Sequence, residues 1–359
     1  MNILITAPSL DVTKNVSGIS AVVNTIIENN TLHTYHHFVA GNEDGNRSIV
    51  KRLLQLLKSY TSLARLYKTK GVQLVHLNLA MNPKSMYRDY LIFLISTLYK
   101  IPVVVHLHGG MFLLKKPTNI VLKNIAQRML TSARAVICLS PMEKDFISNQ
   151  YSLPQVKVLQ NTVSGSYFQL NKTIDYSGNI NVLFMGRLHE SKGIRVILEA
   201  ISKLLEDGHL NLCFVFCGAG PLESEVMQFA GLHPDNVQYR GIAAGIRKAK
   251  ILGACHLFIL PSLYGEGLPV ALIEAMASGL VPVVTNDGSM KTFIKDGETG
   301  FFVDKGSARQ ICRTLVELIG NIEKIRTVSF NARKFITDNF AIDSYIDSLS
   351  NIYTTVLTK

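Results

Sequence analysis

The stretch LPSLYGEGLPVALIEAMASG at residues 260–279 decides the fold of the C-terminal half of this sequence. An apolar run is followed by a glycine-rich loop that contains Glu266. Pro269 can then start an apolar helix, which contains Glu274. A carboxylate surrounded by apolar residues, as Glu274 is, needs partners when it is buried. Because carboxylates accept hydrogen bonds from neighbouring hydroxyl groups, the stretch predicts a ligand-binding loop and helix.

Two turns upstream carry further signals. The segment GRLHESKG, residues 186–193, follows an apolar run and opens a helix, which places Arg187 and Lys192 near a helix N-terminus. Backbone N–H groups at such an end favour anions, and arginine and lysine add positive charge, so this segment predicts a diphosphate site. The small-residue turn CGAGPL, residues 217–222, permits close approach of a ligand, although many such turns are only turns.

Short apolar runs alternate with amphipathic stretches along the whole chain, which predicts parallel sheets covered on both faces. We expect strands at residues 2–7, 35–39, 72–77, 102–107, 135–139, 179–185, 212–217, 237–239, 257–260 and 281–285. We expect helices in the first half at residues 18–29, 48–69, 83–99, 117–132 and 141–149, with further helices between the later strands and over residues 307–355.

The polar, turn-rich region at residues 152–178 separates two such series of strands and helices. We therefore predict an α/β protein with two facing, Rossmann-like, doubly wound domains. The predicted boundaries are 1–162 for the first domain and 163–340 for the second. Residues 341–359 are expected to form a helix that crosses back to the first domain. Ligands bind outside the carboxyl ends of strands in such sheets.

The composition is that of a globular protein, with 47% hydrophobic and 18% charged residues. Five scattered cysteines in apolar surroundings suggest buried thiols in a reducing compartment. The first residues lack the pattern of a signal peptide, and no apolar stretch is long enough to span a membrane. We expect a cytoplasmic protein.

The excess positive charge lies in the N-terminal part. Residues 1–160 contain 18 basic and 7 acidic residues, whereas residues 161–359 contain 19 of each. Six of the basic residues fall in the predicted helix at 48–69 and just after it: Lys51, Arg52, Lys58, Arg65, Lys68 and Lys70. Two interpretations are open, a solvated helix face or attraction to an anionic membrane surface or a phosphorylated acceptor. No nucleic-acid-binding motif accompanies the charge, so we do not expect a nucleic-acid partner.

Residues 181–300 resemble the donor domain of the retaining glycosyltransferases of family four, which have the GT-B fold and are also called glycosyl transferases group 1. The resemblance rests on GRLHESKG, on the GAGP turn and on two glutamates with seven residues between them. It implies that Arg187 and Lys192 bind the donor diphosphate, Glu266 the sugar and Glu274 the ribose hydroxyls. The donor-binding positions that it implies are Gly186, Arg187, Lys192, Gly218, Gly220, Arg240, Glu266, Gly267, Leu268, Pro269 and Glu274.

The N-terminal half resembles the family more loosely. The segment VSGIS, residues 16–20, takes the place of a glycine-rich loop, but Ser17 replaces the usual first glycine, which leaves Gly18 as the residue for phosphate approach. The segment HLHGG, residues 106–110, resembles the histidine-glycine element of the family, which makes His108 the candidate that contacts the donor sugar. We expect His106 to point to the opposite face of the strand and to be a core histidine whose hydrogen bonds are satisfied.

The resemblance implies a retaining glycosyltransferase in cell-surface polysaccharide biosynthesis. Such an enzyme moves a hexose or N-acetylhexosamine, with a UDP-sugar favoured as donor, to a saccharide or lipid-linked acceptor. No Asp-x-Asp motif is present, so we expect no metal and no cofactor other than the nucleotide-sugar co-substrate. The candidate catalytic residues are His108, Arg187, Lys192 and Glu266, and none is assigned as a nucleophile.

Three alternatives stay open at this point. A nucleotide-sugar 2-epimerase shares the GT-B architecture, and a non-catalytic nucleotide-sugar-binding subunit of a polysaccharide assembly complex would retain similar pockets. A dinucleotide dehydrogenase fits least, because no third glycine completes the fingerprint that begins at Gly218. Peripheral attachment to the inner face of the plasma membrane is a further expectation, based on the basic N-terminal half.

Overall fold

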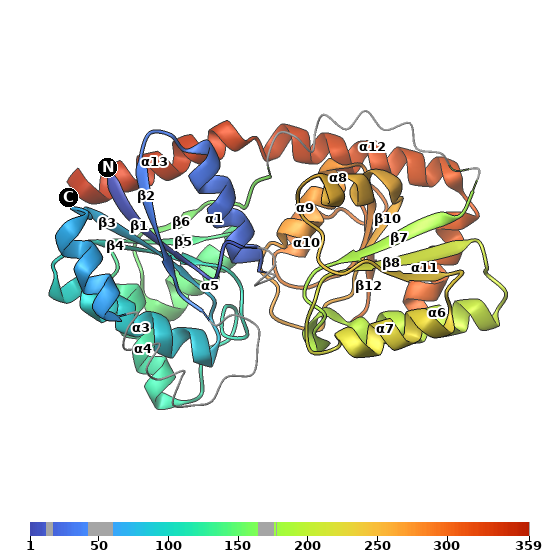
Figure 1. The fold of residues 1–359 in the computed structure, drawn as a ribbon, viewed down its shortest axis with the longest axis horizontal. Coiled ribbons are helices and arrows are strands. Elements are labelled where there is room, and N and C mark those ends of the chain that lie inside the picture. Colours follow the sequence, from blue (N-terminus) through green and yellow to red (C-terminus); the bar gives the residue numbers. More distant parts are fainter. Residues whose placement is uncertain (12–16, 42–59, 164–175, 177, 359) are drawn as a thin grey trace. The chain divides into compact units, whose positions relative to one another are not determined.

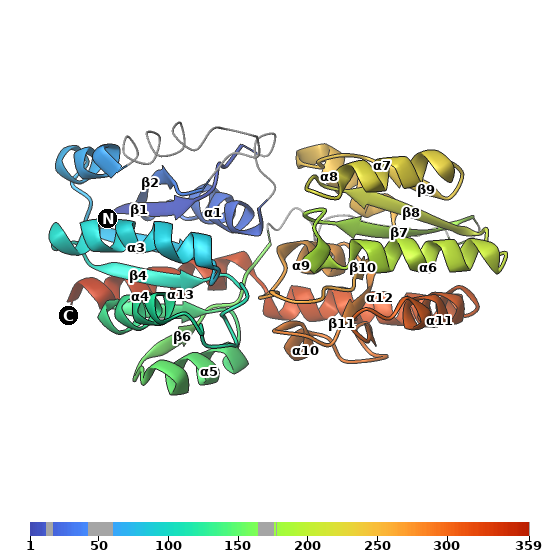
Figure 2. The ribbon, with the colours of Figure 1, turned by 90° about the horizontal axis from the view of Figure 1, so that it is seen from below.

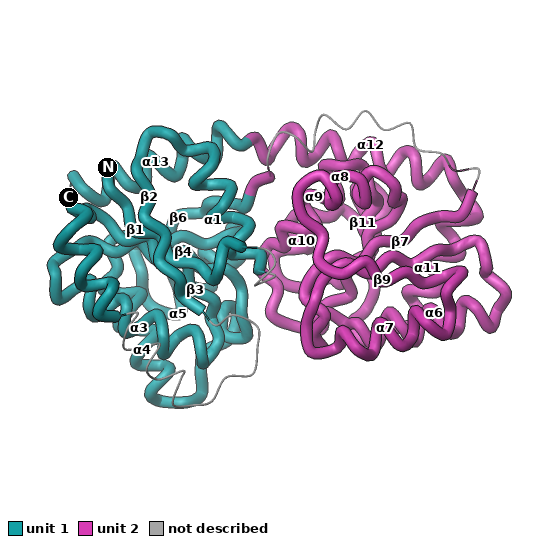
Figure 3. The backbone as a smooth tube through the Cα atoms, in the orientation of Figure 1, with its two compact units in different colours: residues 1–161, 342–359 teal, residues 162–341 magenta. Residues whose placement is uncertain are grey.

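The computed structural model describes residues 1–11, 17–41, 60–163, 176 and 178–358. The chain divides into two compact units, residues 1–161 with 342–359 and residues 162–341 (Figure 3). The boundaries predicted from the sequence, 162/163 and 340/341, lie next to these limits. Each unit is built around its own parallel sheet of six strands.

In the first unit the strands lie in the order β2-β1-β3-β4-β5-β6. Their bounds are β1 Asn2–Ala7, β2 Thr34–Val39, β3 Leu74–Leu79, β4 Val103–Leu107, β5 Ala135–Cys138 and β6 Val156–Val158. Strands β1, β3 and β4 consist almost wholly of buried residues, as expected for strands covered on both faces. The sheet changes direction between β1 and β3, which makes the carboxyl ends of these two strands the expected position of a ligand.

Helices lie on both faces of this sheet (Figure 1). They are α1 Gly18–Asn29, a helix that includes residues 60–69, α3 Pro83–Leu98, α4 Ile120–Ser132, α5 Pro141–Tyr151 and α13 Ile342–Thr358. Local sequence explains several helix starts. Pro83 begins α3, the Asn119 side chain accepts from two amides at the start of α4, and Ser140 accepts from the amide of Glu143 in α5.

The C-terminal helix α13 packs with the first unit, as predicted from the sequence. It contacts α1, and the hydroxyl of Tyr353 lies 2.6 Å from Nδ1 of His76 on β3. Asn30, which directly follows α1, donates a hydrogen bond from Nδ2 to Oγ of Ser350 at 3.2 Å. The last segment of the chain therefore helps to cover the sheet that the first segment starts.

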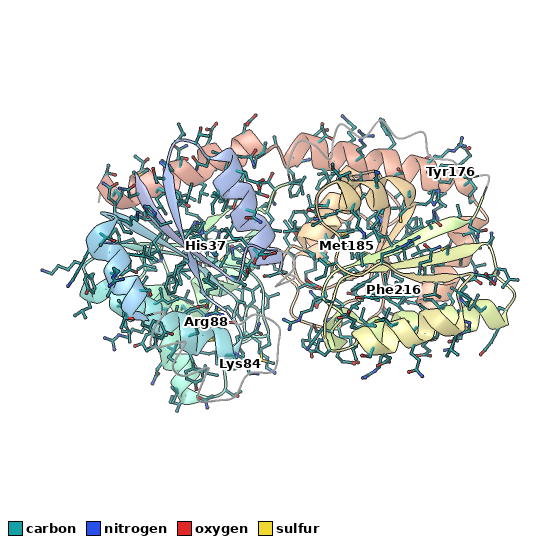
Figure 4. The ribbon with its side chains drawn as sticks, viewed as in Figure 1. His37, Lys84, Arg88, Tyr176, Met185 and Phe216 are labelled. Carbon is teal, nitrogen blue, oxygen red and sulfur yellow. The ribbon has the colours of Figure 1, made fainter. Side chains whose placement is uncertain are left out.

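In the second unit the strands lie in the order β12-β11-β10-β7-β8-β9 (Figure 2). Their bounds are β7 Ile180–Met185, β8 Leu212–Cys217, β9 Val237–Tyr239, β10 Leu257–Leu260, β11 Val281–Thr285 and β12 Phe301–Val303. The change of direction falls between β7 and β10. Figure 4 marks Met185 at the end of β7 and Phe216 on the neighbouring β8.

The helical segments of the second unit connect these strands and end the unit. They are the 3-10 turn Glu190–Lys192, α6 Ile194–Glu206, α7 Glu223–Leu232, α8 Gly245–Ala254, α9 Val270–Ala277, α10 Met290–Phe293, α11 Ala308–Ile319 and α12 Ile322–Asn339. Helix α9 is buried along nearly its whole length and packs against α12 and the strands β10 and β11. This explains why its sequence is apolar all round apart from Glu274.

The structure differs from the sequence prediction in several details. Strands β6 and β12, each of three residues at an edge of its sheet, were not predicted. Strand β3 begins and ends two residues later than predicted, since Asn78 continues the pairing with β4 and its side chain donates to the Thr6 carbonyl. Residues 48–59 of the predicted basic helix, with Lys51, Arg52 and Lys58, lie outside the described residues.

The five cysteines are free thiols, and four of them are buried. Burial raises the pKa of Cys138 and raises that of Cys217 to about 11, so these thiols stay protonated at neutral pH. Among the described residues, no helix has the length and apolar character needed to cross a membrane.

Candidate active site

The loop after β7 places the predicted diphosphate-binding residues at the change of strand direction. The loop begins at Gly186, and His189 caps the 3-10 turn by accepting from the amide of Ser191 at 3.1 Å. Arg187 is exposed, whereas the Lys192 side chain is only 26% exposed. The pKa of His189 is lowered mainly by burial and also by the positive charges of Arg187 and Lys192. These three basic side chains therefore lie near one another. His189 was not predicted as a site residue.

Gly218 and Gly220 are required by the packing of this loop. A Cβ at Gly218 would lie 1.8 Å from the carbonyl oxygen of Gly186, and one at Gly220 would lie 2.4 Å from that of Leu188. The amide of Leu188 donates to the carbonyl of Ala219 at 3.0 Å, so the two loops continue the contact between β7 and β8. The structure explains both glycines by backbone packing. Their role toward a ligand stays a prediction.

Glu266 lies beside Lys192 although 74 residues separate them in sequence. The Lys192 Nζ lies 2.5 Å from Oε1 of Glu266, and the hydroxyl of Ser262 donates to the same oxygen at 2.5 Å. The Glu266 side chain is 5% exposed. Because β7 and β10 are neighbours and both loops leave their carboxyl ends, the sheet order itself brings the two predicted site segments together.

Glu274 on α9 has the kind of partner that its burial requires. Nζ of Lys248 on α8 lies 2.5 Å from Oε1 of Glu274, and the two side chains are 16% and 7% exposed. Lys248 was not predicted from the sequence, because nothing in the helix of residues 245–254 links this lysine to a carboxylate in the next helix. A cation thus neutralises each of the two glutamates of the motif.

The residues between the two glutamates lead into α9. Gly267 and Leu268 are buried, and Pro269 stands immediately before the first helical residue, Val270. The backbone therefore passes from the Glu266 loop directly into the helix that carries Glu274. The contact of Gly267, Leu268 and Pro269 with the donor, which the family resemblance implies, stays a prediction.

Arg240 lies at the end of β9 and lines a pocket of about 390 Å³. Its guanidinium donates to the side chain of Gln238 at 2.7 Å, and Arg247 on α8 donates to the Arg240 carbonyl. Arg247 and Lys250 line the same pocket. The pocket is open and basic, which is compatible with an anionic ligand and does not identify one.

The first unit holds the other two predicted site residues, each after the carboxyl end of a strand. Gly18 is the exposed first residue of α1, and an added Cβ there would meet nothing within 4 Å. His108 directly follows β4, and its Nε2 lies 2.6 Å from Oδ1 of Asn78 on β3. Burial lowers the pKa of His108 to about 3, so its ring is neutral at physiological pH.

The expectation that His106 points away from His108 was wrong. Their ring centroids are 4.1 Å apart, because residues two apart in a strand share a face. The expectation of a core residue was correct, since His106 is fully buried, but the expectation that its hydrogen bonds are satisfied was wrong, because Nε2 has no hydrogen-bond partner among the described residues. Its Nδ1 lies 3.1 Å from Nε2 of His76, and burial lowers the pKa of His106 well below its ordinary value.

Among the described residues, no group of three or more histidine, cysteine, aspartate or glutamate side chains is arranged to hold a metal ion. Whether the reaction needs a metal is a separate question, and metal independence stays a prediction.

Two family descriptions match this chain. Residues 179–321 match "Glycosyl transferases group 1", and residues 29–164 match "Glycosyltransferase Family 4". A related sequence, the UDP-Gal:alpha-D-GlcNAc-diphosphoundecaprenol alpha-1,3-galactosyltransferase of Escherichia coli, is 26% identical over 318 residues, covering 84% of this chain and 80% of that protein.

Solved structures share the fold along the whole chain. The Anabaena protein Alr3699/HepE in complex with UDP-glucose superposes with a TM-score of 0.74 at 16% identity, covering 99% of this chain and 100% of the other. The sucrose-phosphate synthase of Thermosynechococcus elongatus gives a TM-score of 0.79 at 15% identity, with 99% of each chain covered. The architecture is that of GT-B glycosyltransferases. With family matches in both halves and this fold, the chain belongs to the glycosyltransferases of family four.

Proposed function

We propose that this protein is a retaining glycosyltransferase that uses a nucleotide sugar, UDP-linked by preference, and a saccharide or lipid-linked acceptor. The observation that carries the proposal is the contact of Lys192 with Glu266, in the loops that follow the neighbouring strands β7 and β10. It unites a cation suited to a diphosphate with a carboxylate suited to a sugar. The related E. coli enzyme is named for a UDP-galactose donor and a diphosphoundecaprenol-linked acceptor, which supports this choice of substrates.

The ion pair also suggests how the donor is received. When the donor binds, Lys192 exchanges its contact with Glu266 for a contact with the diphosphate, and Arg187 adds a second positive charge. Glu266 then accepts hydrogen bonds from the sugar. Ser262 continues to orient the Glu266 carboxylate. Glu274, held by Lys248, retains acceptor capacity for the ribose hydroxyls.

In the reaction, the bond between the anomeric carbon and the diphosphate oxygen breaks, and a bond from the acceptor oxygen forms on the same face of the sugar. The acceptor proton passes to the departing diphosphate. Arg187 and Lys192 stabilise the negative charge that develops on this leaving group. No residue of the chain is assigned a covalent role.

A nucleotide-binding screen tests the proposal. We would measure thermal shifts and calorimetric binding with UDP, GDP, ADP, CMP and their common sugar conjugates, without added metal, because a ligand that binds the native state raises the melting temperature. A selective shift that is lost in Lys192→Ala is expected. Absence of a shift with every nucleotide would contradict the proposal, and epimerised nucleotide sugar without acceptor would replace it by a 2-epimerase.

We further propose that the first unit docks peripherally on an anionic membrane, at the inner face of the plasma membrane. Tyr87, Leu91 and Leu98 on α3 are 45%, 45% and 78% exposed, and their spacing places them on one face of the helix. Lys84 on the same helix is also exposed (Figure 4). Apolar side chains beside basic ones suit the surface of an anionic bilayer.

Flotation with vesicles tests the docking. The protein is expected to bind vesicles containing phosphatidylglycerol at low salt and to bind them less at high salt. The double variant Leu91→Ser with Leu98→Ser should weaken binding, whereas Leu210→Ser, which removes an exposed leucine of the second unit, should not. A protein that ignores anionic vesicles at low salt would contradict the docking and leave the proposed reaction untouched.

A further inference from the structure

His108 is held by one strong hydrogen bond from the neighbouring strand. Its Nε2 lies 2.6 Å from Oδ1 of Asn78, which is 2% exposed on β3. The Asn78 amide is itself fixed, because its Nδ2 donates to the carbonyl of Thr6 on β1 at 2.8 Å. The backbone amide of Asn78 donates to the Thr6 hydroxyl at 3.0 Å, which ties β3 to β1 at the same point.

These contacts determine which nitrogen of His108 carries the proton. The Asn78 NH₂ group faces the Thr6 carbonyl, so Oδ1 faces His108, and Oδ1 can only accept. His108 must therefore donate from Nε2. In a neutral imidazole the other nitrogen, Nδ1, is then an acceptor. Among the residues that the structure describes, none hydrogen-bonds to this Nδ1 atom.

A second contact supports the ring of His108 from the side. The His106 ring lies with its centroid 4.1 Å away, and Nδ1 of His106 lies 3.1 Å from Nε2 of His76. His76 in turn lies 2.6 Å from the hydroxyl of Tyr353 on α13. The titratable groups that adjoin His108 are thus two further buried histidines. Positive charge on any one ring would be repelled by charge on the others, which favours three neutral rings.

We propose that Asn78 is a positioning residue that locks His108 in the neutral tautomer with its proton on Nε2, so that Nδ1 accepts a hydrogen bond from a hydroxyl group of the bound sugar. The proposal rests on the proposed function and on the expectation, from the family resemblance, that His108 contacts the donor sugar. His108 then orients a hydroxyl and transfers no proton. Asn78 acts only through His108, and no substrate contact is assigned to it.

The tautomer can be observed directly in the unaltered protein. We would record long-range proton–nitrogen NMR spectra of protein labelled with ¹⁵N-histidine and assign the His108 signals by their loss in His108→Ala. The expected spectrum shows a neutral ring protonated on Nε2 that does not titrate between about pH 5 and pH 8. A ring protonated on Nδ1, or one with an ordinary titration in this range, would overturn the proposal.

Two substitutions of Asn78 test its part. Asn78→Ala should give a mixture of tautomers and lower kcat about tenfold, with little change in the Kd for the nucleotide alone. Asn78→Asp places a carboxylate beside Nε2 and should raise the pKa of His108, which introduces a new titration in the NMR signals. Asn236→Ala, which removes a part-buried asparagine that caps backbone carbonyls in the second unit, should leave the His108 spectrum unchanged.

A double-mutant cycle separates positioning from general structural damage. If Asn78 acts through His108, then Asn78→Ala should lower kcat no further in a His108→Ala background. Additive losses would overturn the positioning role. If the expected tautomer is found but His108→Ala and Asn78→Ala both leave transfer unchanged, the substrate contact of His108 is wrong, and this failure is distinct from a failure of the tautomer assignment.

Discussion

Lys192 and Glu266 form a largely buried ion pair, with 2.5 Å between Nζ and Oε1, between the loops that follow the neighbouring strands β7 and β10 of the second sheet. The pair joins two loops that the sequence separates by 74 residues. Ser262 contacts the same carboxylate oxygen. Lys192 is predicted to bind the diphosphate and Glu266 the sugar, so the two residues can be tested independently.

Lys192→Ala should abolish transfer and remove most of the affinity for a nucleoside diphosphate. The lysine supplies a compact positive charge, and a charge-assisted hydrogen bond contributes about 1.5–3 kcal/mol, which corresponds to roughly a tenfold to hundredfold loss in affinity. Calorimetry with the diphosphate measures this loss. Lys203→Ala is the matched control, because Lys203 forms an exposed pair with Glu199 on α6. Near-normal turnover in Lys192→Ala would contradict the assignment of the diphosphate site.

Lys248→Met should both destabilise the second unit and weaken nucleotide binding. It leaves the Glu274 carboxylate buried without its lysine, and breaking a buried pair on one side costs about 3–5 kcal/mol. The additional substitution Glu274→Gln removes the orphaned charge and should restore much of the stability but not the affinity. Urea unfolding, monitored by circular dichroism, measures the stability, and calorimetry with the nucleotide measures the affinity.

The control for this pair is Lys324→Met, which breaks an exposed pair with Glu317 and should cost less than about 1 kcal/mol. Equal stability losses in Lys324→Met and Lys248→Met would show that burial adds nothing to the pair between α8 and α9.

The sequence predicted most of the second unit because its signals are local. The strands β9, β10 and β11 begin and end where their apolar runs do, and the two glutamates lie on a loop and a helix as expected. The loops carrying Lys192 and Glu266 were assigned to one site from their motifs. The contact between them follows from sheet order, which the strand-and-helix rhythm alone does not define.

What the sequence could not supply are partners that come from distant segments. Lys248 and Asn78 occupy an ordinary helix and an ordinary strand, and only packing brings them to Glu274 and His108. The strands β6 and β12 were missed, although β9, which is equally short, was predicted, so strands of three residues are found from sequence only in some cases. The error at His106 had a different origin, since the alternation of a strand already places it on the face of His108.

Stability should fall as the pH is lowered from neutral. Burial lowers the pKa of His76 and of His108 to about 3 in the folded protein, from an ordinary value of 6.5. As the pH falls below the ordinary value, the unfolded chain binds protons that the folded chain does not, so stability is lost between these two pKa values. At about pH 5 each of these two histidines lowers the free energy of unfolding by about 2 kcal/mol.

Urea midpoints between about pH 8 and pH 5 would measure this loss, since most carboxylates titrate at lower pH. The loss should be confined to the first unit, which hydrogen exchange can resolve peptide by peptide. A midpoint for the first unit that stays constant over this range would contradict the neutral, buried state of the histidines.

Tyr353→Phe should loosen the attachment of α13 to the first sheet. The Tyr353 hydroxyl is the hydrogen-bond partner of Nδ1 of His76 in a fully buried position, and burial raises the pKa of this tyrosine so that it remains a neutral phenol. Removing the hydroxyl leaves a buried histidine nitrogen without a partner, which costs about 1–3 kcal/mol. Tyr151→Phe is a matched control, because the buried Tyr151 hydroxyl has no hydrogen-bond partner among the described residues and its loss should be neutral. The urea midpoint and the exchange protection of α13 check both variants, and an equal effect of the two would mean that the bond from Tyr353 to His76 does not hold the helix.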